Sequence, residues 1–157
     1  MIPQPYPTLS GLSLLGLCIW REARGEAELG KRGVAHAIAN RAKSPSWWGH
    51  DWYTVITKPY QFSSFNEDDP NSKKWPAEED SSWIESLSVA SGVYLGMDED
   101  PTFGAQFYHD TSIEFPKAWG NPTEYENTLN AGRLKFYRHK LRTNALDVAA
   151  TATGESE

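Results

Sequence analysis

Acidic and basic residues are concentrated in IWREARGEAELG, residues 19–30, where an apolar run becomes polar. If a helix ends here, Glu22 lies in its last turn, at the negative end of the helix dipole, and Ile19, Trp20 and Ala23 shield it from water. Both effects disfavour the ionised carboxylate and raise its pKa toward neutrality, which is the property that a general acid needs. Glu22 is therefore a candidate catalytic acid. From periodicity alone, a glutamate at a helix end is more often an ordinary surface residue.

The other charges of this stretch bear on that interpretation. Glu26 and Glu28 are suited to the first turn of a second helix, whose N-terminus acidic side chains stabilise. Arg21 and Arg24 would lower the pKa of Glu22 if they pointed toward its carboxyl group. The assignment of Glu22 therefore depends on where the two arginines point.

Three helices are expected to position these residues. Apolar residues recur at steps of three and four over residues 8–20, which predicts a helix with Thr8 or Ser10 as its N-cap and its end near the Glu22 motif. A second helix is expected over residues 27–43 and a third over residues 81–95. The apolar stripe of the second helix consists of Leu29, Val34, Ala37, Ile38 and Arg41.

The remaining segments are predicted to be loops and a small β element. Residues 44–76 form a segment rich in Pro, Gly, Ser and aromatic residues, and a loop of this length usually carries function. Short, roughly alternating aromatic runs at 103–110 and 132–139 predict two paired strands, with loop residues between them. We expect a mainly α (α+β) fold, one domain over residues 1–142, and a flexible C-terminal tail over residues 143–157.

Composition and charge narrow the class of protein. A chain of 157 residues with 39% hydrophobic and 23% charged residues fits one globular domain, and the net charge of −6 argues against nucleic acid as a partner. No stretch approaches the roughly 20 apolar residues of a membrane span, so we expect no stable membrane insertion. The apolar run at residues 12–20 faintly resembles a signal peptide, but no Lys or Arg precedes it, and we interpret it as a core helix.

No metal or other cofactor is expected. Cys18 is the single cysteine, which excludes an internal disulfide and a zinc site built on thiolates. Four histidines are present, yet none has the H-x-x-x-H or H-E-x-x-H spacing of a zinc enzyme. His36, on the expected second helix, is interpreted as an interior or surface histidine rather than a ligand.

Five ordered blocks between about Gly16 and His139 carry a family resemblance. They are REARGEAELG, VAHAIANR, QFSSFN, DPTFGAQFYHD and GRLKFYRH. In this order the blocks resemble the spore-cortex-lytic-enzyme type of cell-wall hydrolase, a family also found among phage lysis proteins. The resemblance implies a lysozyme-like, mostly helical domain with a small strand element that cuts the glycan strands of peptidoglycan.

The resemblance also assigns the acid. In this family the glutamate that opens the E-A-R-G-E motif is the catalytic acid, and Glu22 occupies that position. The sequence departs from the family pattern at Ser64 and Phe65, where Cys and Trp are common, and at His109 and Asp110, which replace a Tyr-Asn-Pro type of continuation. These departures bear on the substrate preference and leave the acid in place.

The number of carboxylates decides between two reactions. A hydrolytic glycosidase normally uses two carboxylates, about 5 to 5.5 Å apart in retaining enzymes. No second carboxylate is evident, since Glu26 follows a break in the helix and Asp51, Glu67 and Asp110 lie in loops. A lytic transglycosylase needs one acid/base, because the C6 hydroxyl of muramic acid attacks the anomeric carbon. We therefore expect lytic transglycosylation of the MurNAc-GlcNAc β-1,4 bond, with hydrolysis as the alternative.

The expected substrate-binding residues lie in the third, fourth and first blocks. Short polar groups in QFSSFN alternate with phenylalanines and suit hydrogen bonds to an N-acetyl group or ring hydroxyls, and Tyr108 is expected to face Glu22 while Phe107 points to the core. Trp47, Trp48 and Trp52 are candidates for stacking on sugar faces. The full set of substrate-binding predictions is Gln61, Phe62, Ser63, Asn66, Tyr108, His109 and Glu26.

Two alternatives from other classes stay open. A non-catalytic glycan-binding module would pellet with cell walls without releasing soluble muropeptides, and a zinc-dependent amidase would lose activity in chelator. We expect a monomer whose partner is the glycan strand of peptidoglycan, without a signal peptide, in a phage-endolysin-like role. Such a protein stays in the host cytoplasm until a holin-type partner releases it to the periplasm and cell wall.

Overall fold

The computed structural model describes residues 10–59 and 61–140, so the tail predicted at 143–157 lies outside the described residues. The helices are α1 (Gly11–Ala23), α2 (Glu28–Lys43), α3 (Trp52–Thr57) and α4 (Ser81–Tyr94), and the strands are β1 (Phe107–Asp110), β2 (Tyr125–Ala131) and β3 (Leu134–His139). Short 3₁₀ helices are η2 (Ser63–Phe65), η3 (Pro70–Lys73), η4 (Lys117–Trp119) and η5 (Pro122–Glu124). The predicted fold class, mainly helical with a small antiparallel β element, is confirmed.

The three predicted helices are present with small shifts at their ends. Ser10 is the N-cap of α1, where its hydroxyl accepts from the backbone N–H of Ser13. The helix ends at Ala23, within the range expected for its C-terminus, so Glu22 lies in the last turn. Among the described residues, no helix is both long enough and apolar enough to cross a membrane.

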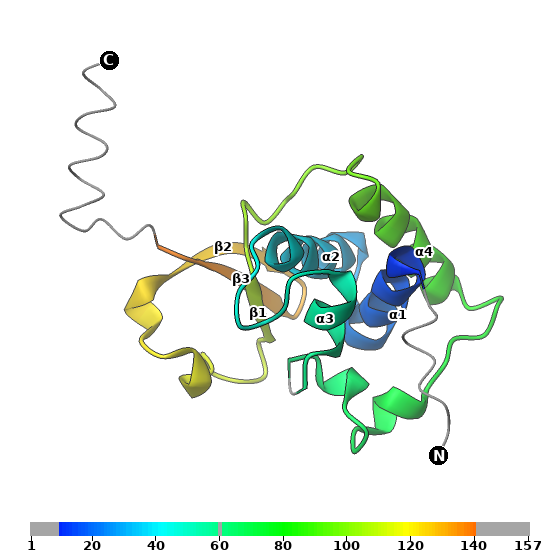
Figure 1. Cartoon of the computed structure of the whole chain (residues 1–157), viewed down its shortest axis with the longest axis horizontal. Coiled ribbons are helices and arrows are strands. Elements are labelled where there is room, and N and C mark those ends of the chain that lie inside the picture. The colour runs from blue at the N-terminus through cyan, green and yellow to red at the C-terminus, as the bar shows by residue number, and fades with distance from the viewer. Residues whose placement is uncertain (1–9, 60, 141–157) are drawn as a thin grey trace.

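The core lies between the helices and continues under the sheet. In Figure 1, α1 and α4 lie side by side, and α2 lies between this pair and the strands. α2 meets the sheet closely because Gly33 has no side chain there: a Cβ at this position would collide with the Phe136 ring of β3. Phe136 is completely buried, so this contact joins the helical and β parts into one core.

The sheet has the strand order β1-β3-β2 and is antiparallel throughout. The predicted pairing of the two aromatic runs is confirmed, with Phe107 opposite Tyr137 and Tyr108 opposite Phe136. The prediction that only loop residues separate these runs is wrong, because β2 occupies part of that segment. β2 is an edge strand of sequence YENTLNA, and its polar residues interrupt the apolar alternation that marks a strand.

The segment at residues 44–76, expected as a long loop, contains the helix α3 and, within its described residues, the 3₁₀ turns η2 and η3. α3 has only six residues, too few for an apolar period to show. Its start is fixed by a capping box in which the carboxylate of Asp51 accepts from the N–H of Thr54 and the hydroxyl of Thr54 accepts from the N–H of Asp51. Residues 64–74 lie against the end of α1, where the side chain of Arg21 donates to their backbone carbonyls.

Candidate active site

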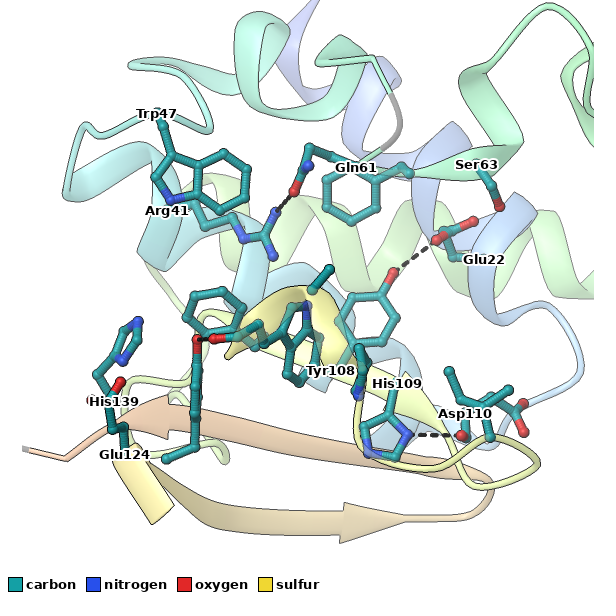
Figure 2. Close-up of a pocket in the computed structure, with 17 residues that line it drawn as sticks. Glu22, Arg41, Trp47, Gln61, Ser63, Tyr108, His109, Asp110, Glu124 and His139 are labelled. Carbon is teal, nitrogen blue, oxygen red and sulfur yellow. Dashed lines mark hydrogen bonds between the residues drawn. The ribbon is translucent and has the colours of Figure 1, made fainter. Parts of the chain in front are cut away.

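Glu22 and Tyr108 meet across the gap between α1 and β1. The Glu22 side chain is partly buried, and the Tyr108 hydroxyl donates a hydrogen bond of 2.9 Å to its Oε1 (Figure 2). Phe107, the neighbouring residue on β1, is buried in the core, as strand alternation requires. The structure therefore places Tyr108 opposite Glu22, where the sequence-based prediction put it.

Arg21 and Arg24 do not pair with Glu22. The buried guanidinium of Arg21 donates to backbone carbonyls within residues 64–74 and lies over two aromatic rings. Its acceptors are the carbonyls of Ser64, Ser72 and Lys74, and the rings, 4.8 and 4.9 Å away, are those of Phe65 and Trp75. Arg24 donates to Asn71 over 3.0 Å. Both arginines thus hold residues 63–75 against the end of α1.

Burial raises the pKa of Glu22 above its ordinary value of 4.5. The hydroxyls of Ser64 and Tyr108 act in the opposite direction, because donors stabilise the carboxylate, and the negative charge of Asp69 raises the pKa further. Of the two hydroxyls, only that of Tyr108 reaches Glu22 with hydrogen-bond geometry, since buried Ser64 Oγ has no such partner among the described residues. Glu22 is thus a carboxyl group that holds its proton to higher pH than an ordinary glutamate does, and it has one well-aligned hydrogen-bond donor.

Glu22 lines an open cavity of about 710 Å³, which is within the usual range for a ligand site. The wall is built from the end of α1, the residues around η2, β1 and the segment that leads to β2 (Figure 2). The residues of the wall are Glu22, Arg41, Trp47, Gln61, Phe62, Ser63, Phe107, Tyr108, His109, Asp110, Ile113, Pro116, Ala118, Trp119, Glu124, Tyr125 and His139.

Five of the seven predicted substrate-binding residues lie in this wall: Gln61, Phe62, Ser63, Tyr108 and His109. The ring of Phe62 is tilted against that of Tyr108, with 6.3 Å between centroids. His109 is stacked on Tyr137 at 5.4 Å, and its ring nitrogens lie 2.8 Å from the carbonyl of Asp110 and 3.2 Å from the hydroxyl of Tyr137. Phe62, Tyr108 and His109 are thus held by contacts with neighbouring residues in the wall.

The other two predicted residues, Asn66 and Glu26, lie outside the cavity wall. Asn66 borders a separate shallow hollow beside Phe65. Glu26 accepts hydrogen bonds from the backbone N–H of Arg133, over 3.2 and 3.4 Å, and lies against Gly132. Gly132 has a φ of +56°, and a Cβ there would collide with the Glu26 carboxylate. In the structure, Glu26 fixes the β2–β3 turn to the start of α2.

The three tryptophans considered for sugar stacking have different surroundings. Trp47 is 56% exposed and lines the cavity. Trp48 is buried against the Trp47 ring, and its indole N–H donates to the carbonyls of Arg41 and Ser44. Trp52 packs on Tyr94 outside the cavity. Among these three, only Trp47 presents a free ring face to the cavity.

Two further carboxylates line the cavity, at its exposed rim. Asp110 accepts from the N–H of Ser112 and pairs with Arg133 at 3.4 Å, which lowers the pKa of its carboxyl group. Glu124 is exposed. The other acids considered from the sequence lie elsewhere: Asp51 caps α3, and Glu67 borders the hollow beside Phe65. Glu22 is therefore the acid of this wall that lies deepest among apolar side chains.

Sequence reasoning missed the aromatic part of the wall. Phe107, Trp119 and Tyr125 pack together with centroid distances of 5.2 to 5.9 Å, and the Tyr125 hydroxyl donates to the carbonyl of Trp119. Trp119 and Tyr125 belong to the segment expected as a plain connector, Tyr125 as the first residue of β2, whereas Phe107 lies on the predicted strand β1, where it was expected in the core and not in a cavity wall. The aromatic residues themselves were the available signal, because tryptophan and tyrosine are uncommon in connectors that lack a packing role.

Arg41 was also misplaced. It was assigned to the apolar stripe of α2, and it is indeed buried, but its guanidinium lies in the wall of the cavity. A charge at a stripe position is itself a signal, because a buried arginine requires acceptors or a ligand.

The zinc-amidase alternative requires a set of metal-ligating side chains. Within residues 10–59 and 61–140, no three His, Cys, Asp or Glu side chains are arranged as a metal site. His36 is buried and pairs with Asp98 at 2.6 Å, on the part of α2 that faces the 98–106 segment. The described part of the chain thus offers an amidase no ligand set.

The chain belongs to the Cell Wall Hydrolase family, whose pattern it matches over residues 25–137. The resemblance inferred from the sequence is therefore confirmed, and the chain is a member of an enzyme family that acts on the cell wall. The match begins three residues after Glu22, so the assignment of the acid depends on the geometry above and on the E-A-R-G-E motif.

Two solved structures share the fold. The catalytic domain of the germination-specific lytic transglycosylase SleB from Bacillus anthracis is 22% identical, with a TM-score of 0.63, and the match covers 82% of this chain and 93% of that chain. The catalytic domain of the Bacillus cereus SleB protein is 23% identical, with a TM-score of 0.59, and the match covers 82% of this chain and 89% of that chain. A search of curated protein sequences gave no significant match.

Proposed function

We propose that the protein degrades peptidoglycan by cleaving the MurNAc-GlcNAc β-1,4 bond, with Glu22 as acid/base. The observation that carries this proposal is the placement of Glu22, whose burial raises its pKa in the wall of an open cavity large enough for a ligand. Family membership and the fold shared with a lytic transglycosylase domain support the choice of substrate.

The proposed chemistry is lytic transglycosylation. The protonated Glu22 donates its hydrogen to the glycosidic oxygen, the C1–O bond breaks, and an oxocarbenium-like centre develops on the muramyl ring. The C6 hydroxyl of the same ring then attacks C1, and its proton passes to the Glu22 carboxylate. The products are a 1,6-anhydro-muramyl end and a free 4-hydroxyl on the other sugar, with no water consumed and the acid regenerated.

Hydrolysis is the second candidate. The observation that favours it is a second carboxylate, that of Asp110, in the wall of the cavity. Its carboxylate lines the same cavity and its lowered pKa keeps it ionised, as a base that activates water must be. Against this, Asp110 is held by Ser112 and Arg133 at the exposed rim, and the strongest influences on the pKa of Glu22 do not include it. We therefore favour the reaction that requires one carboxylate.

The experiment is digestion of purified peptidoglycan by the wild-type protein and by Glu22→Gln, with mass analysis of the soluble products. Glu22→Gln keeps the shape of the side chain and removes the proton donor, so we expect the rate to fall by about 10²- to 10⁴-fold with little change in the melting temperature. Wild-type products are expected to be lighter by one water than those of a hydrolytic muramidase.

Glu28→Gln is the matched control, because Glu28 is an exposed acid at the start of α2, outside the cavity. It should retain wild-type activity. Products with ordinary reducing ends, together with loss of activity in Asp110→Asn, would favour hydrolysis. Normal digestion by Glu22→Gln would exclude Glu22 as the acid.

We also propose, from the sequence resemblance to phage lysis proteins, that the enzyme acts in host-cell lysis after release by a holin-type partner. Expression of the chain in bacterial cytoplasm tests this role. Cells should stay intact until the inner membrane is permeabilised and should then lyse, whereas lysis without permeabilisation would exclude dependence on a release partner.

A further inference from the structure

Arg41 is a buried cation in the wall of the cavity that has no acidic partner among the described residues. It is only 6% exposed, and its guanidinium lies near the rings of Trp48, Phe62 and Phe107, at 5.4 to 5.6 Å from their centroids. Figure 2 shows it between Trp47 and Gln61, pointing into the cavity. Burial in these apolar surroundings lowers its pKa to about 10.

The other buried cations of the fold have better-matched acceptors. Lys31, one turn from the start of α2, pairs with Glu85 at 3.0 Å, and Arg21 donates to three backbone carbonyls. Arg41 has one short contact, 2.6 Å from Nε to the carbonyl of Gln106, and one long contact, 3.4 Å from Nη1 to Oε1 of Gln61. Its Nη2 has no acceptor among the described residues, so part of a guanidinium fork is left for a ligand.

The chemistry of the missing partner follows from the guanidinium group. Its planar fork matches the two oxygens of a carboxylate, and a buried cation without a counter-charge is costly unless a ligand supplies one. Asp110, which is half-buried, and Glu124, which is exposed, line the same cavity, and neither forms an ion pair with Arg41. Among the described wall residues, Arg41 is the one Lys or Arg side chain.

We propose that Arg41 binds a carboxylate carried by the muramyl residue of the substrate, and that it thereby selects muramic-acid-containing strands over uncharged amino-sugar polymers. This inference rests on the proposed function. The carboxylate has two sources: the lactyl group of the sugar, which is free in peptide-free strands, and the stem peptide, which carries its own carboxylates in intact peptidoglycan.

The test compares the cleavage of three substrates by four proteins. The substrates are peptide-free glycan strands, the same strands with their carboxyl groups converted to methylamides, and intact peptidoglycan. The proteins are wild type, Arg41→Gln, Arg41→Lys and the control Arg32→Gln, which removes a cation of α2 that pairs with Asp98 outside the cavity. The kcat/KM values and the melting temperature of each protein are measured.

Wild type should prefer strands with free carboxylates over their methylamides by about ten- to a hundredfold, the usual range for a hydrogen bond to a charged group. Arg41→Gln should lose that factor on the charged strands and keep its rate on the methylamides. Arg41→Lys should fall between the two, and Arg32→Gln should match wild type. The charged substrate on which the effect appears, peptide-free or intact, identifies the source of the carboxylate.

Equal cleavage of charged and methylamide strands by wild type overturns the proposal without any variant, so it stays testable if Arg41→Gln does not fold. An equal loss on both substrates in Arg41→Gln also overturns it, because a purely structural role moves both rates together. Failure of wild type to cleave any of the three substrates contradicts the proposed function instead.

Discussion

The cavity has two sides that differ in construction. On the acid side, one hydrogen bond joins the Tyr108 hydroxyl to the Glu22 carboxyl group, and Ser63 lines the same wall. On the aromatic side, the rings of Phe107, Trp119 and Tyr125 interlock within 6 Å of one another. The acid side therefore depends on a few polar atoms, and the aromatic side on packed area. Changes on the acid side should alter the rate, whereas changes on the aromatic side should alter stability or binding.

The largest expected effect on stability is that of Phe107→Ala. Phe107 is 3% exposed and touches four rings, so its removal leaves a void and should cost about 3 kcal/mol of unfolding free energy. Urea denaturation measures this. Phe103→Ala is the matched control, because Phe103 is 68% exposed, and it should change little. A small cost for Phe107→Ala would show that the aromatic side does not support the fold.

Tyr108→Phe sharpens the comparison on the acid side. The hydroxyl of Tyr108 lowers the pKa of Glu22, so its removal should raise that pKa and move the alkaline limb of the kcat/KM profile to higher pH. The maximal rate should fall by about tenfold, because Glu22 loses its aligning donor. Tyr94→Phe, on α4, serves as the control. An alkaline limb that stays in place or moves to lower pH would contradict the assigned contact.

Trp47→Ala should have the smallest effect, confined to binding. Its exposed ring lines the cavity, and an aromatic contact is worth about 0.5 to 1.5 kcal/mol, so KM should rise about two- to tenfold while kcat and the melting temperature hold. Tyr53→Ala removes an exposed ring from α3, outside the cavity, and should leave KM unchanged. A fall in kcat without a rise in KM would show that Trp47 does not contribute to substrate binding.

The helical part of the fold and the acid could be predicted from the sequence because local rules decide them. The apolar period of α1 places its C-terminus close to Glu22, and dipole and burial then act on the same carboxyl group. Strand alternation likewise places Tyr108 opposite Glu22 and Phe107 in the core.

The features that could not be predicted from the sequence depend on contacts between segments that are distant in the chain. β2 is a polar edge strand that exists because the turn at Gly132 folds it onto β3. Arg41 occupies an apolar stripe position, yet its charge reaches the cavity, a placement set by the rings of Phe62 and Phe107 from distant segments. Asn66 and Glu26 were grouped with the site by closeness in sequence, and the turns that follow η2 and α1 carry them away from the cavity.

The most direct test of the central claim is an NMR titration of the Glu22 carboxyl group in the wild-type protein. Because burial raises its pKa in the folded state, the stability that this group contributes is present below its ordinary value of 4.5 and is lost as the pH rises through the raised value. We predict a midpoint clearly above 4.5 that coincides with the alkaline limb of the kcat/KM profile. A midpoint at or below 4.5 would contradict the claim that burial raises the pKa of Glu22 and so allows it to act as a proton donor.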